Sequence, residues 1–126
     1  MDTHDVVGTR VLIVDDERAL RMLVTMELEG EGYQVKTAED GDEALAILLK
    51  EAFDLVILDI RMPRMNGLSV LREMKSKDIR PRVVVLTGVD DLEIAIQAMR
   101  LGANDYVTRP FDSGTLLASI RCVLTV

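Results

Sequence analysis

Three short runs of apolar, largely β-branched residues stand out along the chain: Val11–Val14, Leu55–Leu58 and Val83–Leu86. Polar or turn-forming residues follow each run, a pattern typical of strands that are buried on both faces of a parallel sheet. Tyr33–Thr37 alternates between apolar and polar residues, as a half-exposed strand does, and Asp105–Thr108 is short and mixed. The pattern therefore predicts five strands, with these last two at the edges of the sheet.

Segments with helical spacing of apolar residues separate the strands. The expected apolar sets are Ala19, Met22, Leu23 and Met26; Ala44, Leu45 and Leu48; Val70, Leu71 and Met74; Leu92, Ala95, Ile96 and Met99; and Leu116, Ile120 and Val123. Residues able to cap helices are Asp40 (with Glu43 as a capping box), Asn66, Asp90 or Asp91, and Asp112, and Gly30, Gly32 and Gly102 can end them. Because crossovers between parallel strands are right-handed, this alternation predicts a doubly wound α/β sheet with helices on both faces.

Composition narrows the class of protein. The 126 residues suffice for one domain, and with 48% hydrophobic but only 3% aromatic residues its core must be aliphatic. The net charge of −7 argues against direct contact with nucleic acid or with an anionic membrane. One cysteine, Cys122, and one histidine, His4, exclude an internal disulfide, a cysteine-rich zinc site and a histidine-based triad. Without an apolar run of membrane-spanning length or a signal-peptide pattern, we expect a soluble, cytoplasmic domain.

Polar residues follow the predicted strands at the edge where open α/β sheets bind ligands. They are Asp15, Asp16 and Glu17, then Asp59, then Thr87 and Gly88, and finally Arg109 and Pro110. If the first and third strands are neighbours, three carboxylates converge and must retain a proton or bind a cation, for which Mg²⁺ is suited. An acidic pair after a strand can also simply start a helix favourably, but that explanation leaves Asp59, Thr87 and Arg109 unaccounted for.

Four segments, taken in order, resemble the receiver domain of two-component response regulators over nearly the whole chain. They are Val11-Leu-Ile-Val-Asp-Asp-Glu17, Leu58-Asp-Ile-Arg-Met-Pro-Arg-Met-Asn-Gly67, Leu86-Thr-Gly88 and Gly102-Ala-Asn-Asp-Tyr-Val-Thr-Arg-Pro-Phe111. The resemblance implies a flavodoxin-like fold of five helices and five strands in the order 2-1-3-4-5, and a domain that spans residues 1–126.

The resemblance also implies a phosphorylation-dependent switch. Asp59 would accept a phosphoryl group from a histidine kinase or a phosphotransfer protein. Asp16, Asp59 and the backbone carbonyl of Arg61 would hold Mg²⁺, and Asp15 would act through a water. The remaining implied site residues are Thr87 and Arg109, which would bind phosphoryl oxygens, Gly88, which leaves the approach open, and Tyr106, the switch aromatic. The signal would pass to a downstream effector domain or protein, and a homodimer on phosphorylation is another outcome that the resemblance allows.

Each of these residues also has a simpler explanation. Thr87 could cap its own turn, Tyr106 could be an ordinary edge-strand tyrosine, and Asn66–Gly67 could only shape a loop, as could the Met62–Pro63 step. Arg109–Pro110 could be an ordinary turn; the family's bond at this position is usually cis, so we expect a cis bond here.

Arg109 departs from the resembled family, which carries lysine there. A planar guanidinium prefers bidentate contacts, so Arg109 could bridge Asp59 or Asp15 in the resting state and compete with Mg²⁺. The alternative function is therefore an interaction module with the receiver fold that phosphorylation does not regulate. Two enzyme-like classes fit less well: a haloacid-dehalogenase phosphatase needs a second aspartate where Arg61 stands, and the acidic first loop would repel a flavin phosphate.

The segment Leu92–Leu101 carries a second apolar set, Ile94, Ala98 and Leu101, on the side opposite the first. This second set is the expected output surface, although one broad buried face would give the same pattern. The last helical pattern runs to Val126 without a stop signal. The chain either ends there or is the N-terminal part of a longer regulator.

Overall fold

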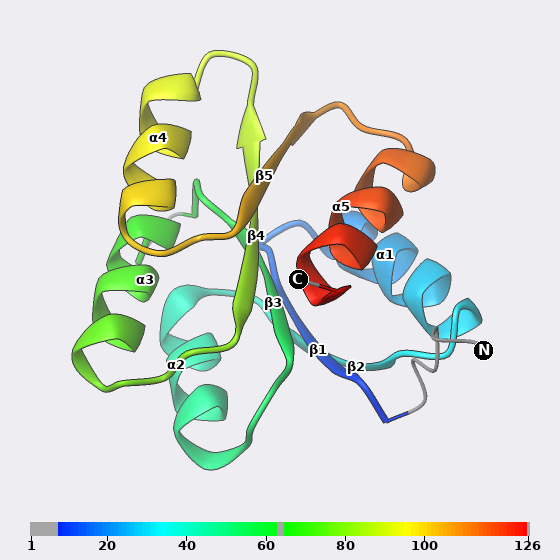
Figure 1. Ribbon diagram of the computed structural model, residues 1–126, viewed down its shortest axis with the longest axis horizontal. Coiled ribbons are helices and arrows are strands. Elements are labelled where there is room, and N and C mark those ends of the chain that lie inside the picture. The colour runs from blue at the N-terminus through cyan, green and yellow to red at the C-terminus, as the bar shows by residue number, and fades with distance from the viewer. Residues whose placement is uncertain (1–7, 63–64, 126) are drawn as a thin grey trace.

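The computed structural model describes residues 8–62 and 65–125, so His4, Pro63 and Val126 lie outside the described residues. Strands and helices alternate along the chain, as the sequence predicts (Figure 1). Their bounds are β1 Arg10–Val14, α1 Arg18–Gly30, β2 Gln34–Ala38, α2 Gly41–Lys50, β3 Leu55–Asp59, α3 Gly67–Ser76, β4 Arg82–Gly88, α4 Leu92–Arg100, β5 Asp105–Arg109 and α5 Ser113–Thr125.

The sheet is entirely parallel, with the strands in the order β2-β1-β3-β4-β5. This order confirms the predicted doubly wound fold. The three apolar runs form the central strands β1, β3 and β4, and the side chains of Val11–Val14 and Leu55–Leu58 are fully buried. The weaker patterns form the edge strands β2 and β5. All five strands direct their carboxyl ends to one edge of the sheet, which is where the candidate site lies.

Helices cover both faces of the sheet (Figure 1). The first layer, α1 and α5, packs on one face over a core that includes Val11, Ile57 and Ile120. The second layer, α2, α3 and α4, packs on the other face over a core that includes Leu12 and Leu58. Successive residues of a strand point to opposite faces, so the continuous apolar runs supply both cores.

Three of the predicted helix caps are confirmed. Asp40, Asn66 and Asp112 accept hydrogen bonds from the N–H groups of Glu43, Ser69 and Thr115 at 2.9, 3.0 and 2.7 Å. Gly102 follows α4 with a φ of +110°, which is the left-handed conformation that glycine adopts without strain. The Arg109–Pro110 bond is cis, as expected.

Replacing Asp40 with alanine is expected to destabilise the protein by about 1 kcal/mol, because the first turn of α2 loses its side-chain acceptor. Urea unfolding measures the change. Asp42→Ala is the matched control, since Asp42 is an exposed aspartate in the same turn that does not cap the helix. An equal loss in the two variants would contradict a capping role for Asp40.

The predicted buried face of α1 is wrong. Ala19, Met22, Leu23 and Met26 are exposed, whereas Val24 and Leu28 are buried against the sheet and Leu20 packs at the edge of the same core. Both sets have helical spacing, so periodicity alone could not choose between them. In the folded chain α1 packs on β1, β2 and α5, and Val24 and Leu28 are the residues that enter this core.

Candidate functional site

Three carboxylates converge at the carboxyl edge of the sheet. Asp15 and Asp16 follow β1, Asp59 ends β3, and these two strands are neighbours. One oxygen from each carboxylate lies within 4.8 Å of the others. Asp15 and Asp59 are 0% and 3% exposed, whereas Asp16 is exposed to solvent. The expected convergence is therefore confirmed, with two buried carboxylates and one at the mouth of the site.

Arg109 bridges the two buried carboxylates. Its Nη2 lies 2.7 Å from Asp15 Oδ2 and 3.0 Å from Asp59 Oδ1. β5 ends at Arg109, two strands away from β3, so the long side chain reaches across the end of β4. The resting-state contact expected for an arginine at this position is thus present, and it involves both aspartates.

Burial makes the carboxylates of this site costly to ionise. Burial first, and then the charge of Asp15, raises the pKa of the Asp59 carboxyl from 3.8 to about 7, although Arg109 and the N–H of Arg61 act in the opposite direction. Burial likewise raises the pKa of Asp15, against a hydrogen bond from the N–H of Glu17 and the charge of Arg109. One guanidinium therefore does not fully compensate two buried carboxylates, and the site favours an additional cation or a proton.

The donor set fits Mg²⁺. Carboxylate oxygens from Asp15, Asp16 and Asp59 are hard ligands, and the exposed Asp16 leaves the site open to the waters that Mg²⁺ retains. Asp59 Oδ1 also accepts a hydrogen bond of 3.1 Å from the N–H of Arg61, which holds the loop after β3 against this carboxylate.

A hydroxyl and a glycine stand at the end of the next strand, β4. Thr87 is 2% exposed, and the register pairs Asp59 with Leu86, so Thr87 comes one position beyond the level of Asp59. The N–H of Gly88 donates to Asp91 Oδ2 at 3.4 Å. The structure thus brings a hydroxyl, a cation and three carboxylates to one edge of the sheet, as the sequence predicts.

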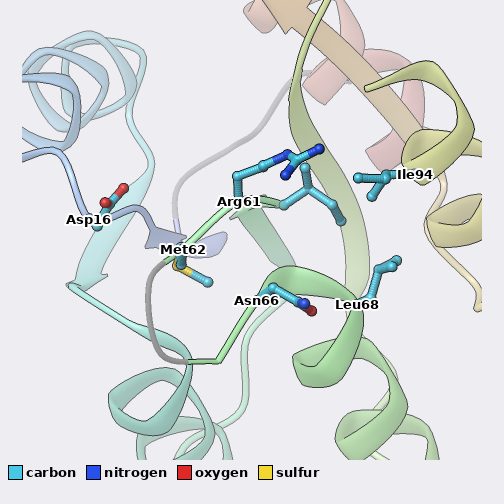
Figure 2. A pocket seen from close by; sticks show the side chains of 7 residues that line it. Asp16, Arg61, Met62, Asn66, Leu68 and Ile94 are labelled. Atoms are coloured by element: carbon cyan, nitrogen blue, oxygen red, sulfur yellow. The ribbon is translucent and has the colours of Figure 1, made fainter. Parts of the chain in front are cut away.

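A pocket of about 410 Å³ opens beside these carboxylates (Figure 2). Its lining residues are Asp16, Ile60, Arg61, Met62, Asn66, Leu68 and Ile94. In Figure 2 Asp16 stands on one side of the pocket, and the Arg61 side chain extends toward the side on which Ile94 lies. The pocket therefore joins the carboxylate end of the site to the start of α4.

A model of the response regulator receiver domain matches residues 11–121. The chain belongs to this family. Response regulator receivers are signalling domains, and the order of strands found here is theirs.

Curated relatives of this receiver include transcription regulators. The chain is 40% identical over 114 residues to an uncharacterized transcriptional regulatory protein, YkoG, of Bacillus subtilis, with 90% of this chain and 50% of that protein aligned. It is 39% identical over 115 residues to the response regulator MprA of Mycolicibacterium vanbaalenii, with 91% of this chain and 50% of that protein aligned. The chain thus spans about half the length of these relatives.

Solved structures agree with the family. The crystal structure of FixJ-N superposes with a TM-score of 0.86 at 30% identity, covering 93% of this chain and 94% of the other. The chemotaxis protein CheY4 of Vibrio cholerae superposes with a TM-score of 0.84 at 36% identity, covering 92% and 98%. In the described part of this receiver, no helix is both long and apolar enough to span a bilayer.

The expected output surface needs a correction. Ala98 is fully buried and Ile94 and Leu101 pack against the core, so this set is not exposed. The exposed apolar residues of α4 come instead from the other set and are Leu92, Ile96 and Met99. Ala95 and Ala98 are the smallest residues of the two sets, and burying both lets α4 approach the sheet closely while the bulkier side chains turn outward. Tyr106, on the neighbouring strand β5, is 39% exposed.

An ion pair that the sequence did not reveal links two loops of the site. Arg61 Nε and Nη2 lie 3.0 and 2.6 Å from Asp91 Oδ1. Hydrogen bonding to Arg61 lowers the pKa of the Asp91 carboxyl. The partners are thirty positions apart and carry no shared pattern, so only the meeting of the β3–α3 and β4–α4 loops pairs them.

Proposed function

We propose that this receiver is a switch in which Asp59 accepts a phosphoryl group, with Mg²⁺, from a histidine kinase or a phosphotransfer protein. The observation that carries the proposal is the environment of Asp59. This carboxylate is nearly buried at the end of β3, close to the carboxylates of Asp15 and Asp16 and within 3.0 Å of Arg109 Nη2. Three carboxylates and a cation thus meet at the carboxyl edge of the sheet, and this set would supply the nucleophile, the metal ligands and the positive charge that the proposed reaction needs.

The proposed step uses one oxygen of Asp59 as the nucleophile. This oxygen attacks the phosphorus of the partner's phosphohistidine, the P–O bond forms, the P–N bond breaks and the imidazole leaves. Asp16, Asp59 and the carbonyl of Arg61 would hold Mg²⁺, and Asp15 would do so through a water. When bound, Mg²⁺ would neutralise part of the charge on the transferred oxygens.

The other residues of the site would bind the phosphoryl group once it is in place. Arg109 already reaches Asp59 and would donate to one oxygen, and the Thr87 hydroxyl would donate to another. Gly88 presents no side chain that would obstruct the approach. Each contact puts a donor where negative charge accumulates, which is the main requirement of phosphoryl transfer.

The signal would leave the domain at the surface formed by α4, β5 and α5. Movement of Thr87 toward the phosphoryl group would allow Tyr106 to turn inward, shifting the population between two packed states. The exposed residues Leu92, Ile96 and Met99 lie on the element that would move, so they are the residues an effector or a second copy of the domain would contact on phosphorylation.

We further propose that residues 1–126 are the receiver part of a longer cytoplasmic transcription regulator. The support is the names of the relatives and their length, about twice that of this chain. The receiver itself would not touch DNA or a membrane, since its net charge is −7, and it would catalyse only its own phosphoryl transfer and hydrolysis. The reading frame beyond Val126 tests the proposal, and a DNA-binding domain is the expected finding.

Incubation with acetyl phosphate and Mg²⁺ is expected to add one phosphoryl group to the protein, detected by intact mass. Asp59→Asn should abolish the adduct, because an amide is not a nucleophile for phosphorus. Asp42→Asn, which removes a charge from an exposed helix turn, should label normally. A wild-type protein that stays unlabelled where an ordinary receiver is labelled overturns the proposal.

The bridge made by Arg109 favours a second candidate function, an interaction module that phosphorylation does not regulate. In this case the guanidinium would retain Asp15 and Asp59 and keep Mg²⁺ out. Arg109→Lys separates the two candidates. Labelling of this variant together with an unlabelled wild type would select the interaction module, whereas labelling of both selects the switch.

A further inference from the structure

The Arg61–Asp91 pair joins the loop that follows the phosphoacceptor to the start of α4. Arg61 lies two positions after Asp59, and its N–H already donates to Asp59 Oδ1. Its guanidinium uses two nitrogens on one oxygen of Asp91, at 3.0 and 2.6 Å. Figure 2 shows the side chain extending away from Asp16 and toward the α4 side of the pocket. The Arg61 guanidinium, in the loop that follows Asp59, is therefore paired with the Asp91 carboxylate of the neighbouring β4–α4 loop.

The same carboxylate also occupies a backbone donor. Asp91 Oδ2 accepts from the N–H of Gly88, the residue directly after Thr87. A Cβ on residue 88 would lie 3.2 Å from this oxygen, so glycine permits the close approach. Asp91 thus holds two groups that could otherwise donate to an anion beside Asp59: the Arg61 guanidinium and the Gly88 N–H.

Asp91 binds these two groups instead of capping the helix that it precedes, α4. It is the residue that precedes α4, yet its side chain makes no capping hydrogen bond. A residue in this position ordinarily accepts from an N–H two or three places along the helix. The first turn of α4 therefore offers this carboxylate alternative donors, to which it can move if Arg61 and Gly88 are taken from it.

We propose that the Arg61–Asp91 pair is a lock on the resting state, and that a phosphoryl group on Asp59 opens it by taking Arg61 and the Gly88 N–H from Asp91. The inference rests on the proposed phosphorylation of Asp59. A phosphoryl group carries more charge than a carboxylate and has three acceptor oxygens, so it competes well for a guanidinium.

The Arg61 side chain is 64% exposed, so its ion pair with Asp91 is weak enough for Arg61 to exchange partners. Asp91 is a positioning residue in this scheme, and its release would alter the start of α4 next to the exposed Leu92.

Opposite substitutions of the pair give opposite expected results. Asp91→Asn removes the negative charge and so weakens the hold on both Arg61 and Gly88, so affinity for beryllofluoride in the presence of Mg²⁺ should rise about fivefold, a typical coupling between linked sites. Arg61→Gln removes the cation that the anion would recruit, so affinity should fall by about the same factor. Asp90→Asn removes an equal charge from the adjacent exposed residue and should change the affinity less than about twofold, since an exposed charge is screened.

Titration of the Mg²⁺-loaded protein with beryllofluoride, followed by NMR, tests the lock. The Arg61 Nε–H and Gly88 N–H signals of the wild type should move together on binding. In Asp91→Asn the two signals should lie closer to their bound positions before the anion is added.

Affinities that change in the same direction in Asp91→Asn and Arg61→Gln, or in neither, would overturn the lock while leaving phosphorylation of Asp59 intact. Failure of the wild type and all variants to bind the anion, with no acetyl phosphate adduct on Asp59, would overturn the proposed function and the lock with it.

Discussion

Replacing Asp59 with asparagine is expected to stabilise the Mg²⁺-free protein by roughly 4 kcal/mol at pH 8, as the shift of its pKa from 3.8 to about 7 implies. The ionised carboxylate is nearly buried beside Asp15 and is compensated only in part by Arg109. Asparagine retains an oxygen for the Arg61 N–H without the charge. The group most important for the proposed function is therefore expected to be among the most costly for stability.

The gain should depend on pH. Because the pKa of Asp59 is higher in the folded protein than in the unfolded chain, the folded state binds the proton more tightly, and stability falls as the pH rises from about 4 to about 7. Below this window the carboxyl is protonated in both states, and the advantage of Asp59→Asn disappears. Above it the advantage is constant.

Urea unfolding of wild type and Asp59→Asn across this pH range, with a chelator present, measures the effect. Asp42→Asn, which removes one acidic charge from an exposed position, is the matched control and should show no comparable dependence on pH. A difference between wild type and Asp59→Asn that is the same at pH 4 and pH 8 would contradict a buried, uncompensated charge at Asp59.

Replacing Arg109 with glutamine is expected to destabilise the Mg²⁺-free protein by about 2 kcal/mol at pH 8. Removing one partner of a fully buried pair costs about 3–5 kcal/mol, and the partial exposure of Arg109 (32%) together with proton uptake by the aspartates reduces this cost. Thermal unfolding measures the loss. Arg109→Lys retains the positive charge and should recover most of the stability.

Mg²⁺ should rescue Arg109→Gln more than it stabilises the wild type. In the wild type the guanidinium competes for Asp15 and Asp59, whereas in the variant these carboxylates lack a cation. A ligand that binds only the folded state raises its stability in proportion to the logarithm of the ligand concentration over the dissociation constant. A larger rise in melting temperature for the wild type than for Arg109→Gln would show that Arg109 does not compete with the metal.

Local patterns in this sequence were sufficient to predict most of the fold. The runs Val11–Val14, Leu55–Leu58 and Val83–Leu86 were correctly predicted to be central strands, because each is short, continuous and largely β-branched. The caps Asp40 and Asn66 were equally legible, since their hydrogen bonds involve neighbours three positions away. The caps depend on contacts within one segment. The central strands are buried on both faces, so it does not matter for the prediction which face of the sheet each side chain points to.

Most of the site could be located for a related reason. Parallel strands bring their carboxyl ends to one edge, so knowing the strand order was enough to bring Asp15, Asp59 and Thr87 together. The order itself came from the resemblance of four motifs to receiver domains. The bridge from Arg109 to the aspartates was one of two arrangements that the residue type allowed, and the packed structure selected it.

The facing of the amphipathic helices was decided only by tertiary packing. In α1 two apolar stripes have helical spacing, and in α4 the buried face takes Ala95 from one set and Ala98 from the other, so a hydrophobic pattern cannot say which residues meet the sheet. The direction of each loop and the room above the strands decide it: Val24 and Leu28 are buried in α1 while Met22 and Met26 remain outside.

The sequence by itself thus determines the helices and strands, their order along the chain and the strand ends that carry the polar site residues. It does so because the interactions involved are local or recur with a regular period. The exposed face of α4 and the Arg61–Asp91 pair have neither property. Both arise where segments distant in sequence meet in the folded chain. Side chains thirty positions apart share no sequence period from which their contact could be predicted, so only the tertiary structure decides which residues they contact.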